Sequence, residues 1–450
     1  MYKNPWAAIG VLAFGVAVGT LQMTAVVPML PVLQRQLHAP LTAVSWALTA
    51  ALLSGAVTIP LLSRLGDLYG RRPVALAALG LLVAGSVLSA LATTLPVMIA
   101  GRVLQGVAAS LLPLAIGIAR QAVARDRLPT AIGVLSAMIG LGSGAGMILA
   151  GLAGGTYQAL FWILAGLGAA SLALVVVFVR EPAGPALRGR PDVAGAILTA
   201  GWLVCLLLAI SQGAAWGWTS PGVLGLSVAG AVLFGGWVVQ ARRSASPLIE
   251  IPMLLHRGTV GATVASLLLG FALFGTITTL SAVAQAQGAS VLRVGLYLLP
   301  AALLMLAVSL SAGRLMRRFS ASALVGAGSV LVACTAFGLA TSSGTPLGLY
   351  AASAVLGVGI GLGYAALGTM AVEHVEPAKT AAAGGVNALV RLVGSSLAGA
   401  VTGAVLSGAG AGWSFAIAGC AAVVSAVFSY VNGVLARFPL AAPVPACDDQ

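Results

Sequence analysis

Long apolar runs, separated by short polar segments, constrain the fold of this chain more than any other feature of its sequence. Each of the fourteen runs is close to the length of about 20 apolar residues that a helix needs to cross a bilayer. Only 7% of the residues are charged, whereas a typical soluble domain has about a quarter. The sequence therefore predicts an all-α membrane protein with these spans: 7–30, 43–62, 74–95, 97–119, 130–152, 160–179, 193–212, 223–240, 259–284, 294–312, 323–340, 347–372, 383–408 and 413–435.

The lysines and arginines are distributed in a way that fits this number of spans. With the N-terminus placed in the cytoplasm, 18 of the 22 lie in cytoplasmic segments, Arg35 and Arg293 lie outside, and Arg102 and Arg391 lie within spans. Cytoplasmic loops of membrane proteins carry an excess of these residues. We therefore expect a multi-pass protein of the cell membrane with both termini in the cytoplasm. Orientation in a lipid bilayer then explains the net charge of +13, and no nucleic acid partner is expected.

The motifs that would indicate an enzyme or an ATP-driven motor are absent from the sequence. No G-x-x-x-x-G-K-[ST] segment is present to bind ATP, and no H-E-x-x-H segment is present to bind zinc. The four cysteines are scattered and form no C-x-x-C pair. We expect a protein that is not an enzyme and that uses no cofactor, metal or ATP.

The segment 63–73, between the second and third spans, combines small, acidic and basic residues at fixed spacing. The residues that carry the pattern are Gly66, Asp67, Gly70, Arg71 and Arg72. The pattern G-x-x-x-D-x-x-G-R-R resembles the loop between the second and third helices of the major facilitator superfamily of transporters, with Ser63 in place of the first glycine. The resemblance implies a cytoplasmic gating loop, in which Asp67 stabilises the outward-facing state. A basic loop that only orients the protein is the simpler alternative.

Further segments resemble the fourteen-span drug:proton antiporters of this superfamily. In the fourth span, Arg102 and Gln105 fit R-x-x-Q-G, and in the thirteenth, Arg391 begins an R-x-x-G segment. In the fifth span, a glycine-rich segment resembles the antiporter motif, although Met147 stands where the family has a proline. Its glycines Gly142, Gly146 and Gly151 also predict close helix packing, whatever the family. Arg102 is near enough to the outer end of its span that snorkelling to the interface stays open.

The first span resembles the family pattern L-D-x-T but has Gln22 where the acid belongs, followed by Thr24. None of the nine acids lies in the middle of a span, so the protein would have to use Asp67, Glu373 or His374 at cytoplasmic helix ends for proton coupling, or couple transport in another way. We assign Gln22, Thr24, Arg102, Gln105, Asn387, Arg391 and Glu373 to the transport pathway or its coupling. Without a buried acid to pair with a cation, this set suits neutral or anionic amphiphiles better.

An internal repeat divides the chain. The segment 313–320, after the tenth span, echoes 63–70, with Arg317 where Asp67 stands. The repeat predicts a major facilitator fold of two six-helix bundles, 1–180 and 257–450 with a short tail, around an inserted helix pair with cytoplasmic linkers, 181–256.

The sequence thus predicts a transporter that exports small amphipathic compounds, such as drugs, antibiotics or metabolites, by alternating access and with coupling to H+. An uptake or facilitated carrier of the same fold, and a non-transporting membrane sensor, are the alternatives.

Overall fold

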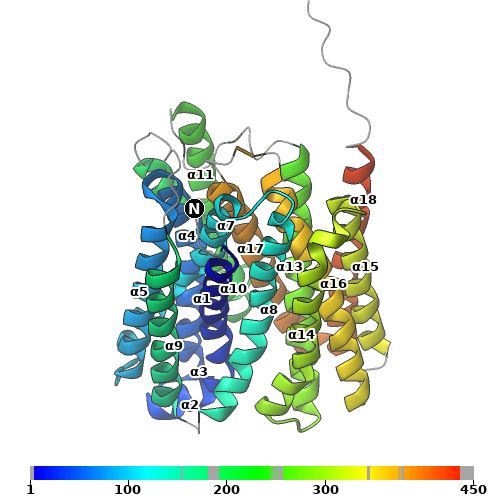
Figure 1. Cartoon of the computed structure of the whole chain (residues 1–450). Coiled ribbons are helices and arrows are strands. Elements are labelled where there is room, and N and C mark those ends of the chain that lie inside the picture. Colours follow the sequence, from blue (N-terminus) through cyan, green and yellow to red (C-terminus); the bar gives the residue numbers. More distant parts are fainter. Residues whose placement is uncertain are drawn as a thin grey trace, which may run out of the picture.

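In the computed structural model, the chain forms a bundle of long helices (Figure 1). The structure describes residues 5–153, 156–180, 192–244, 247, 251, 257–341, 345–373, 375–376 and 380–435. Within this part of the chain, fourteen helical segments are long and apolar enough to cross a membrane. The predicted all-α membrane fold with fourteen spans is confirmed.

The spans fall into three consecutive groups. The N-terminal half comprises α1 (Pro5–Ala25), α4 (Trp46–Tyr69), α5 (Arg71–Ala90), α6 (Leu95–Gly106) continued by α7 (Leu111–Ala122), α8 (Leu128–Leu152) and α9 (Tyr157–Phe178). The inserted pair is α10 (Val193–Trp216) and α11 (Pro221–Arg243). The C-terminal half comprises α13 (Arg257–Ala286), α14 (Val291–Leu315), α15 (Ala321–Thr341), α16 (Pro346–Glu373), α17 (Thr380–Gly408) and α18 (Ala411–Leu435). The sequence boundaries drawn between these groups, which lie partly outside the described residues, stay a prediction.

The two halves repeat the same packing. Helix α1 packs on α8 as α13 packs on α17, and α5 packs on α9 as α15 packs on α18. Glycines make one repeated contact, because Gly85 faces Gly101 between α5 and α6, and Gly328 faces Gly359 between α15 and α16. The halves meet along α8 and α14 on one side and along α4 and α17 on the other.

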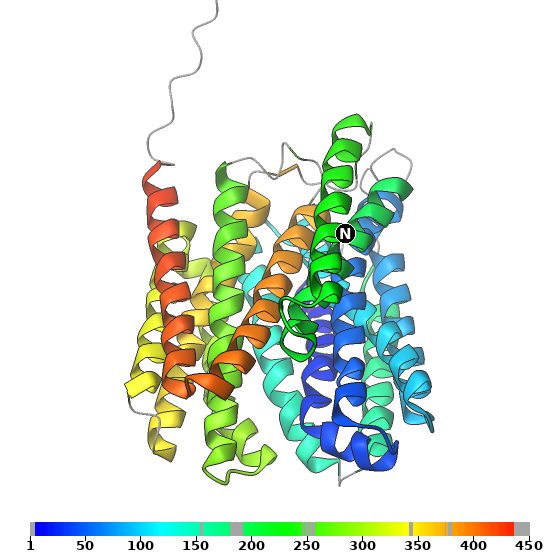
Figure 2. The ribbon, with the colours of Figure 1, turned by 180° about the vertical axis from the view of Figure 1, so that it is seen from behind.

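The inserted pair covers the second of these seams. Helix α10 contacts both α4 and α17, and Figure 2 shows the green pair beside the orange α17 and the blue α4. An aromatic cluster holds α10 to α11, since the ring of Trp202 of α10 is centred 5.3 Å from that of Phe234 and 6.3 Å from that of Trp237, both of α11. The pair therefore lies against both halves without separating them.

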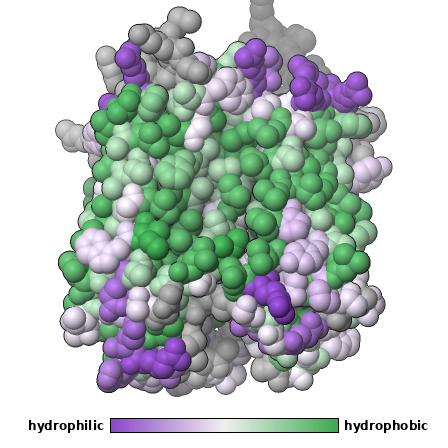
Figure 3. Space-filling view, turned by 60° about the horizontal axis from the view of Figure 1, so that its bottom comes forward, coloured by the Kyte–Doolittle hydropathy of each residue, from purple (hydrophilic) through white to green (hydrophobic). Residues whose placement is uncertain are grey.

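The surface is divided into an apolar flank and polar ends (Figure 3). Because successive spans run in opposite directions, most exposed arginines fall at one end of the bundle, here called the basic end. They are Arg125, Arg127, Arg180, Arg242, Arg243, Arg314, Arg317 and Arg318. The opposite end has the exposed Arg35 and Arg293. The start of α1 and the end of α18 both lie at the basic end (Figure 1).

The segment 63–73 is not the open loop that the sequence suggested. Helix α4 continues to Tyr69 and α5 begins at Arg71, so only Gly70 separates them, at a φ of 105°. Residues 63–69 contain no proline that would end the helix, and glycine is the residue that adopts positive φ without strain. The expected turn is therefore a single residue between two helices, which fixes Asp67 and Arg71 on rigid elements.

Prolines shorten or interrupt two other predicted spans. The first span ends as a regular helix at Ala25 and continues as a short 3₁₀ turn (Val27–Met29) and α2 (Leu30–Gln36), where Pro28 and Pro31 remove backbone donors. The fourth span contains a 3₁₀ turn at Val107–Ser110, just before Pro113. A short helix α3 (Leu41–Val44) precedes α4.

Candidate functional site

An ion pair at the basic end joins the two helices that flank Gly70. The Arg71 guanidinium donates to Asp67 Oδ1 from Nη2 at 2.7 Å and from Nε at 3.0 Å. Arg71 Nη1 donates to the carbonyl of Gly117 in α7 at 2.8 Å. Both charged side chains are almost fully buried. Gly117 leaves room for the guanidinium, because a Cβ there would lie 2.6 Å from Arg71 Nε.

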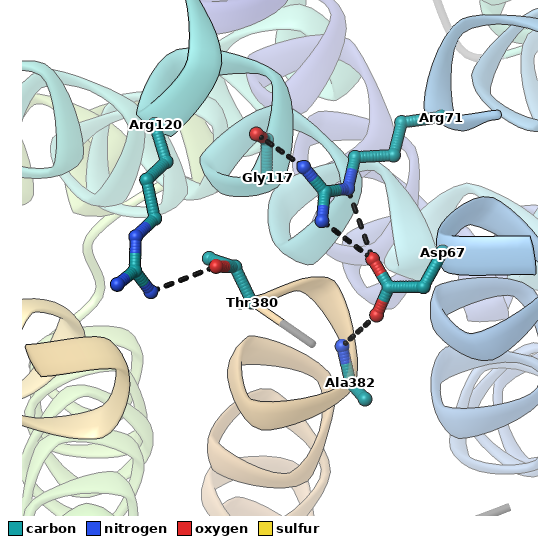
Figure 4. A network of polar contacts seen from close by, with 6 residues as sticks. All are labelled: Asp67, Arg71, Gly117, Arg120, Thr380 and Ala382. Atoms are coloured by element: carbon teal, nitrogen blue, oxygen red, sulfur yellow. Dashed lines mark hydrogen bonds and ion pairs between the residues drawn. The ribbon is translucent and has the colours of Figure 1, made fainter. Parts of the chain in front are cut away.

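The other oxygen of this carboxylate reaches the C-terminal half. Asp67 Oδ2 accepts a hydrogen bond from the backbone N–H of Ala382 at 3.0 Å, in the first turn of α17 (Figure 4). The first N–H groups of a helix have no partner within it and carry partial positive charge, so an acid is stabilised there. Gly385 permits this approach, since a Cβ at that position would lie 2.5 Å from Ser63 Oγ of α4.

A second contact across the halves comes from Arg120, in the last turn of α7. Its Nη1 donates to the carbonyl of Val372 and to Thr380 Oγ1, both at 2.8 Å, and its Nη2 donates to the carbonyl of Val375 at 2.7 Å. The Val372 carbonyl belongs to the last turn of α16 and the Val375 carbonyl follows it, at the helix end where the dipole favours a cation. From the sequence, Arg120 is only one of the cytoplasmic arginines, because its partners lie more than 250 positions away.

The remaining residues assigned to the gate lie around these contacts. Gly66 allows α4 to approach α7, because a Cβ there would overlap Leu114. Arg72 turns toward α9 and donates from Nη2 to the carbonyl of Val176 at 2.9 Å. Glu373 is exposed at the end of α16, next to the Val372 carbonyl that Arg120 contacts. His374 lies outside the described residues.

A second polar cluster lies inside the N-terminal half around Arg102. Its guanidinium is fully buried and donates to Gln22 Oε1 at 2.6 Å, to the carbonyl of Ala47 at 3.0 Å and to Gln105 Oε1. Gln105 in turn donates to Ser86 Oγ at 2.7 Å. Arg102 is therefore turned into the bundle rather than snorkelling outward, and it ties α6 to α1, α4 and α5. The structure brings together three predicted pathway residues, but it gives them partners within one half.

A third polar cluster lies in the C-terminal half, where Arg391 is placed over the ring of Tyr364 of α16, at 4.8 Å from its centroid. Arg391 is partly exposed and makes no hydrogen bond or ion pair with another described residue. One turn earlier, Asn387 Nδ2 donates to Ser266 Oγ of α13 at 2.6 Å. Asn387 and Arg391 were both assigned to the transport pathway from the sequence, whereas no pattern in the sequence identifies Tyr364 as the partner of Arg391.

The glycines of α8 face two different helices. A Cβ at Gly142 or Gly146 would overlap atoms of α1, whereas one at Gly151 would lie 3.3 Å from Leu292 of α14. Thr24 belongs to the first of these contacts, since its Oγ1 donates to the carbonyl of Ser143 at 3.0 Å. These residues therefore hold α8 between α1 and the other half.

Comparison with known proteins places these features in a family. Residues 12–399 match the family model described as Major Facilitator Superfamily. The chain is 28% identical to the tetracenomycin C resistance and export protein of Streptomyces glaucescens, over 90% of this chain and 76% of the relative. It is 27% identical to the methylenomycin A resistance protein of Streptomyces coelicolor, over 88% and 85%. A tetracycline resistance determinant of Streptomyces rimosus is 32% identical over 46% of this chain and 60% of the relative.

Solved structures show the same fold at low sequence identity. The human organic anion transporter MFSD10 superposes with a TM-score of 0.71 at 16% identity, covering 95% of this chain and 100% of that one. The proton:xylose symporter XylE superposes with a TM-score of 0.66 at 13% identity, covering 95% and 96%. Because the family match covers most of a chain that folds in this way, the chain belongs to the Major Facilitator Superfamily of membrane transporters.

Proposed function

We propose that this transporter exports small amphipathic compounds from the cell by alternating access, with its basic end and both termini in the cytoplasm. The observation that supports this proposal is a pair of contacts between the halves at the basic end. Asp67 holds the start of α17 and Arg120 holds the end of α16, so the bundle is closed at this end. An excess of arginine at one end supports the cytoplasmic assignment.

These contacts act as a latch that stabilises the outward-facing state. Each uses a formal charge against the partial charge of a helix end, so each is lost when the halves separate. Other contacts between the halves bring small residues together, such as Gly133 against Ser309, or place a glycine against a large apolar side chain, such as Gly140 against Met305. The latch therefore supplies charged hydrogen bonds to an interface that is otherwise largely apolar.

Proton coupling is part of the proposal. A proton on Asp67 would remove the charge that holds Arg71 and weaken the bond accepted from Ala382, which favours opening toward the cytoplasm. The exposed Glu373 lies beside the Arg120 contact and is a second candidate for proton exchange. The names of the relatives, which refer to resistance and export, support the outward direction.

Everted membrane vesicles test the direction, the substrate and the coupling together. Vesicles acidified inside should accumulate at least one compound of a panel that includes tetracenomycin C, tetracycline, methylenomycin A and neutral or anionic dyes. Collapse of the pH gradient should abolish accumulation, and Asp67→Asn should reduce it at equal protein in the membrane. The matched control Glu376→Gln removes an exposed acid from the same end and should transport normally. Accumulation in right-side-out vesicles instead would make the protein an uptake carrier and refute export.

A further inference from the structure

Arg102 and Arg391, the two arginines that lie within spans, differ in how their charges are paired. Arg102 is fully buried and donates to two glutamine side chains and two backbone carbonyls. Arg391 is partly exposed, and its guanidinium lies over the face of Tyr364 without a hydrogen bond or ion pair to another described residue. We infer that Arg391, placed by Tyr364 and Asn387, binds an acidic group, such as a carboxylate or sulfonate, on the exported compound. The inference rests on the proposed export function and specifies its substrate class.

The depth of Arg391 makes an unpaired charge costly. It lies 11 residues after Thr380, where α17 begins, which is about 16 Å along the helix at about 1.5 Å per residue. That is roughly half of the about 30 Å thickness of the hydrocarbon core. A charge at this depth is usually paired or faces a functional site. No acid lies near the middle of any described span, so a substrate is the available source of counter-charge.

The backbone beneath Arg391 is held firmly. Gly270 of α13 faces the Arg391 carbonyl, where a Cβ would lie at 2.6 Å, and Gly394 lies so close to the Leu267 carbonyl that a Cβ would overlap it. Asn387 anchors the preceding turn to Ser266. The guanidinium is therefore positioned by α13 and by the ring of Tyr364 before any ligand arrives, which lowers the entropy cost of binding.

The chemistry of the cluster fits an aromatic or amphipathic acid. A guanidinium carries five donors in a planar fork that matches a carboxylate or sulfonate. A cation over a ring keeps its charge while using few of those donors, because the ring contact is electrostatic and not a hydrogen bond. The Arg391 donors thus stay available, whereas Nε and Nη1 of Arg102 are used within its own half and only its fully buried Nη2 has no partner among the described residues.

A probe pair that differs by one sulfonate tests this assignment. 8-Anilinonaphthalene-1-sulfonate is an anion, and N-phenyl-1-naphthylamine is the same framework without the charge. Saturable binding of each is measured to the purified protein in nanodiscs of neutral lipid, with empty discs subtracted. We expect Arg391→Gln to weaken binding of the sulfonate by about 10- to 100-fold, the range for a charged hydrogen bond, and to change binding of the neutral parent by less than about 2-fold. Arg391→Lys should keep part of the affinity for the sulfonate.

Controls separate recognition from folding. Arg317→Gln removes an exposed arginine at the basic end and should leave both affinities unchanged. Equal losses for both probes would show that Arg391 has a structural role, and unchanged or undetectable sulfonate binding would also overturn the inference. Export of the two probes is measured separately, in proteoliposomes. If neither is exported although the sulfonate binds through Arg391, the export function fails and the anion site stands.

Discussion

Removal of Arg120 should open the basic end. Its three hydrogen bonds to the C-terminal half reach the carbonyls of Val372 and Val375 and the hydroxyl of Thr380. Hydrogen bonds to a charged group contribute about 1.5–3 kcal/mol each. Because Arg120 is only partly buried, water replaces part of this in the open state, and we take about 1 kcal/mol per bond. Arg120→Met should then shift the equilibrium toward the open state by about 3 kcal/mol, or roughly 100-fold.

Asp67→Ala gives a smaller shift by the same reasoning. It removes one hydrogen bond between the halves, from Ala382 N–H, and leaves Arg71 without its carboxylate. We expect a shift of about 1.5 kcal/mol, close to 10-fold. Since the two residues hold different helices, their effects should add in the double variant.

Distance measurements between spin labels report this equilibrium directly. Labels at Arg125→Cys and Ser320→Cys, both exposed at the basic end and in different halves, are introduced after the native cysteines are replaced by serine. A longer distance should gain population in the order Glu376→Gln, Asp67→Ala, Arg120→Met, with no gain for the first. An unchanged distribution in Arg120→Met would refute the latch, and an equal gain in Glu376→Gln would show that any loss of charge at this end has the same effect.

Three further experiments test the packing, the buried arginine and the orientation. Gly142→Leu should destabilise the protein by about 1–3 kcal/mol because the side chain overlaps α1, seen as a lower thermal unfolding temperature in detergent, whereas Gly166→Leu, which has open space around it, should not. Arg102→Met should cost about 1–3 kcal/mol for each buried acceptor left without a donor, and normal expression and thermal stability would contradict the network. In intact cells, a membrane-impermeant maleimide should label Gln36→Cys and not Arg243→Cys; the reverse pattern would invert the proposed orientation.

The spans could be predicted from the sequence because lipid imposes a simple rule on them. A helix that crosses a bilayer needs one uninterrupted apolar run, and its length alone marks it. The same rule gave a wrong boundary where prolines interrupt the helix. The predicted first span, 7–30, runs past Ala25, where α1 ends, into residues that form a 3₁₀ turn and the start of α2. The rule also misplaced the end of the second span, since the polar residues before Gly70 read as a loop while their backbone remained helical.

The partners of polar residues could not be predicted in the same way. Spacing showed that Asp67 and Arg71 are one turn apart, and it could not show that the start of α17 meets them. Gln22 and Arg102 looked like two pathway residues, and the structure shows them hydrogen bonded to each other. Contacts between distant segments depend on how the halves dock, and no local pattern in the sequence records that docking.

The two arginines within spans illustrate why composition alone cannot assign a role. Both cost free energy to bury, and in both cases the sequence offers no acid nearby. For Arg102 that cost is offset by Gln22 and Gln105, in a cluster that cannot change without disturbing four spans. For Arg391 the fold supplies only the ring of Tyr364 and a fixed backbone, and it leaves the side chain partly exposed. A charge left in this condition is stabilised further only by a ligand, and the absence of mid-span acids in the described chain makes that ligand an anion rather than a cation.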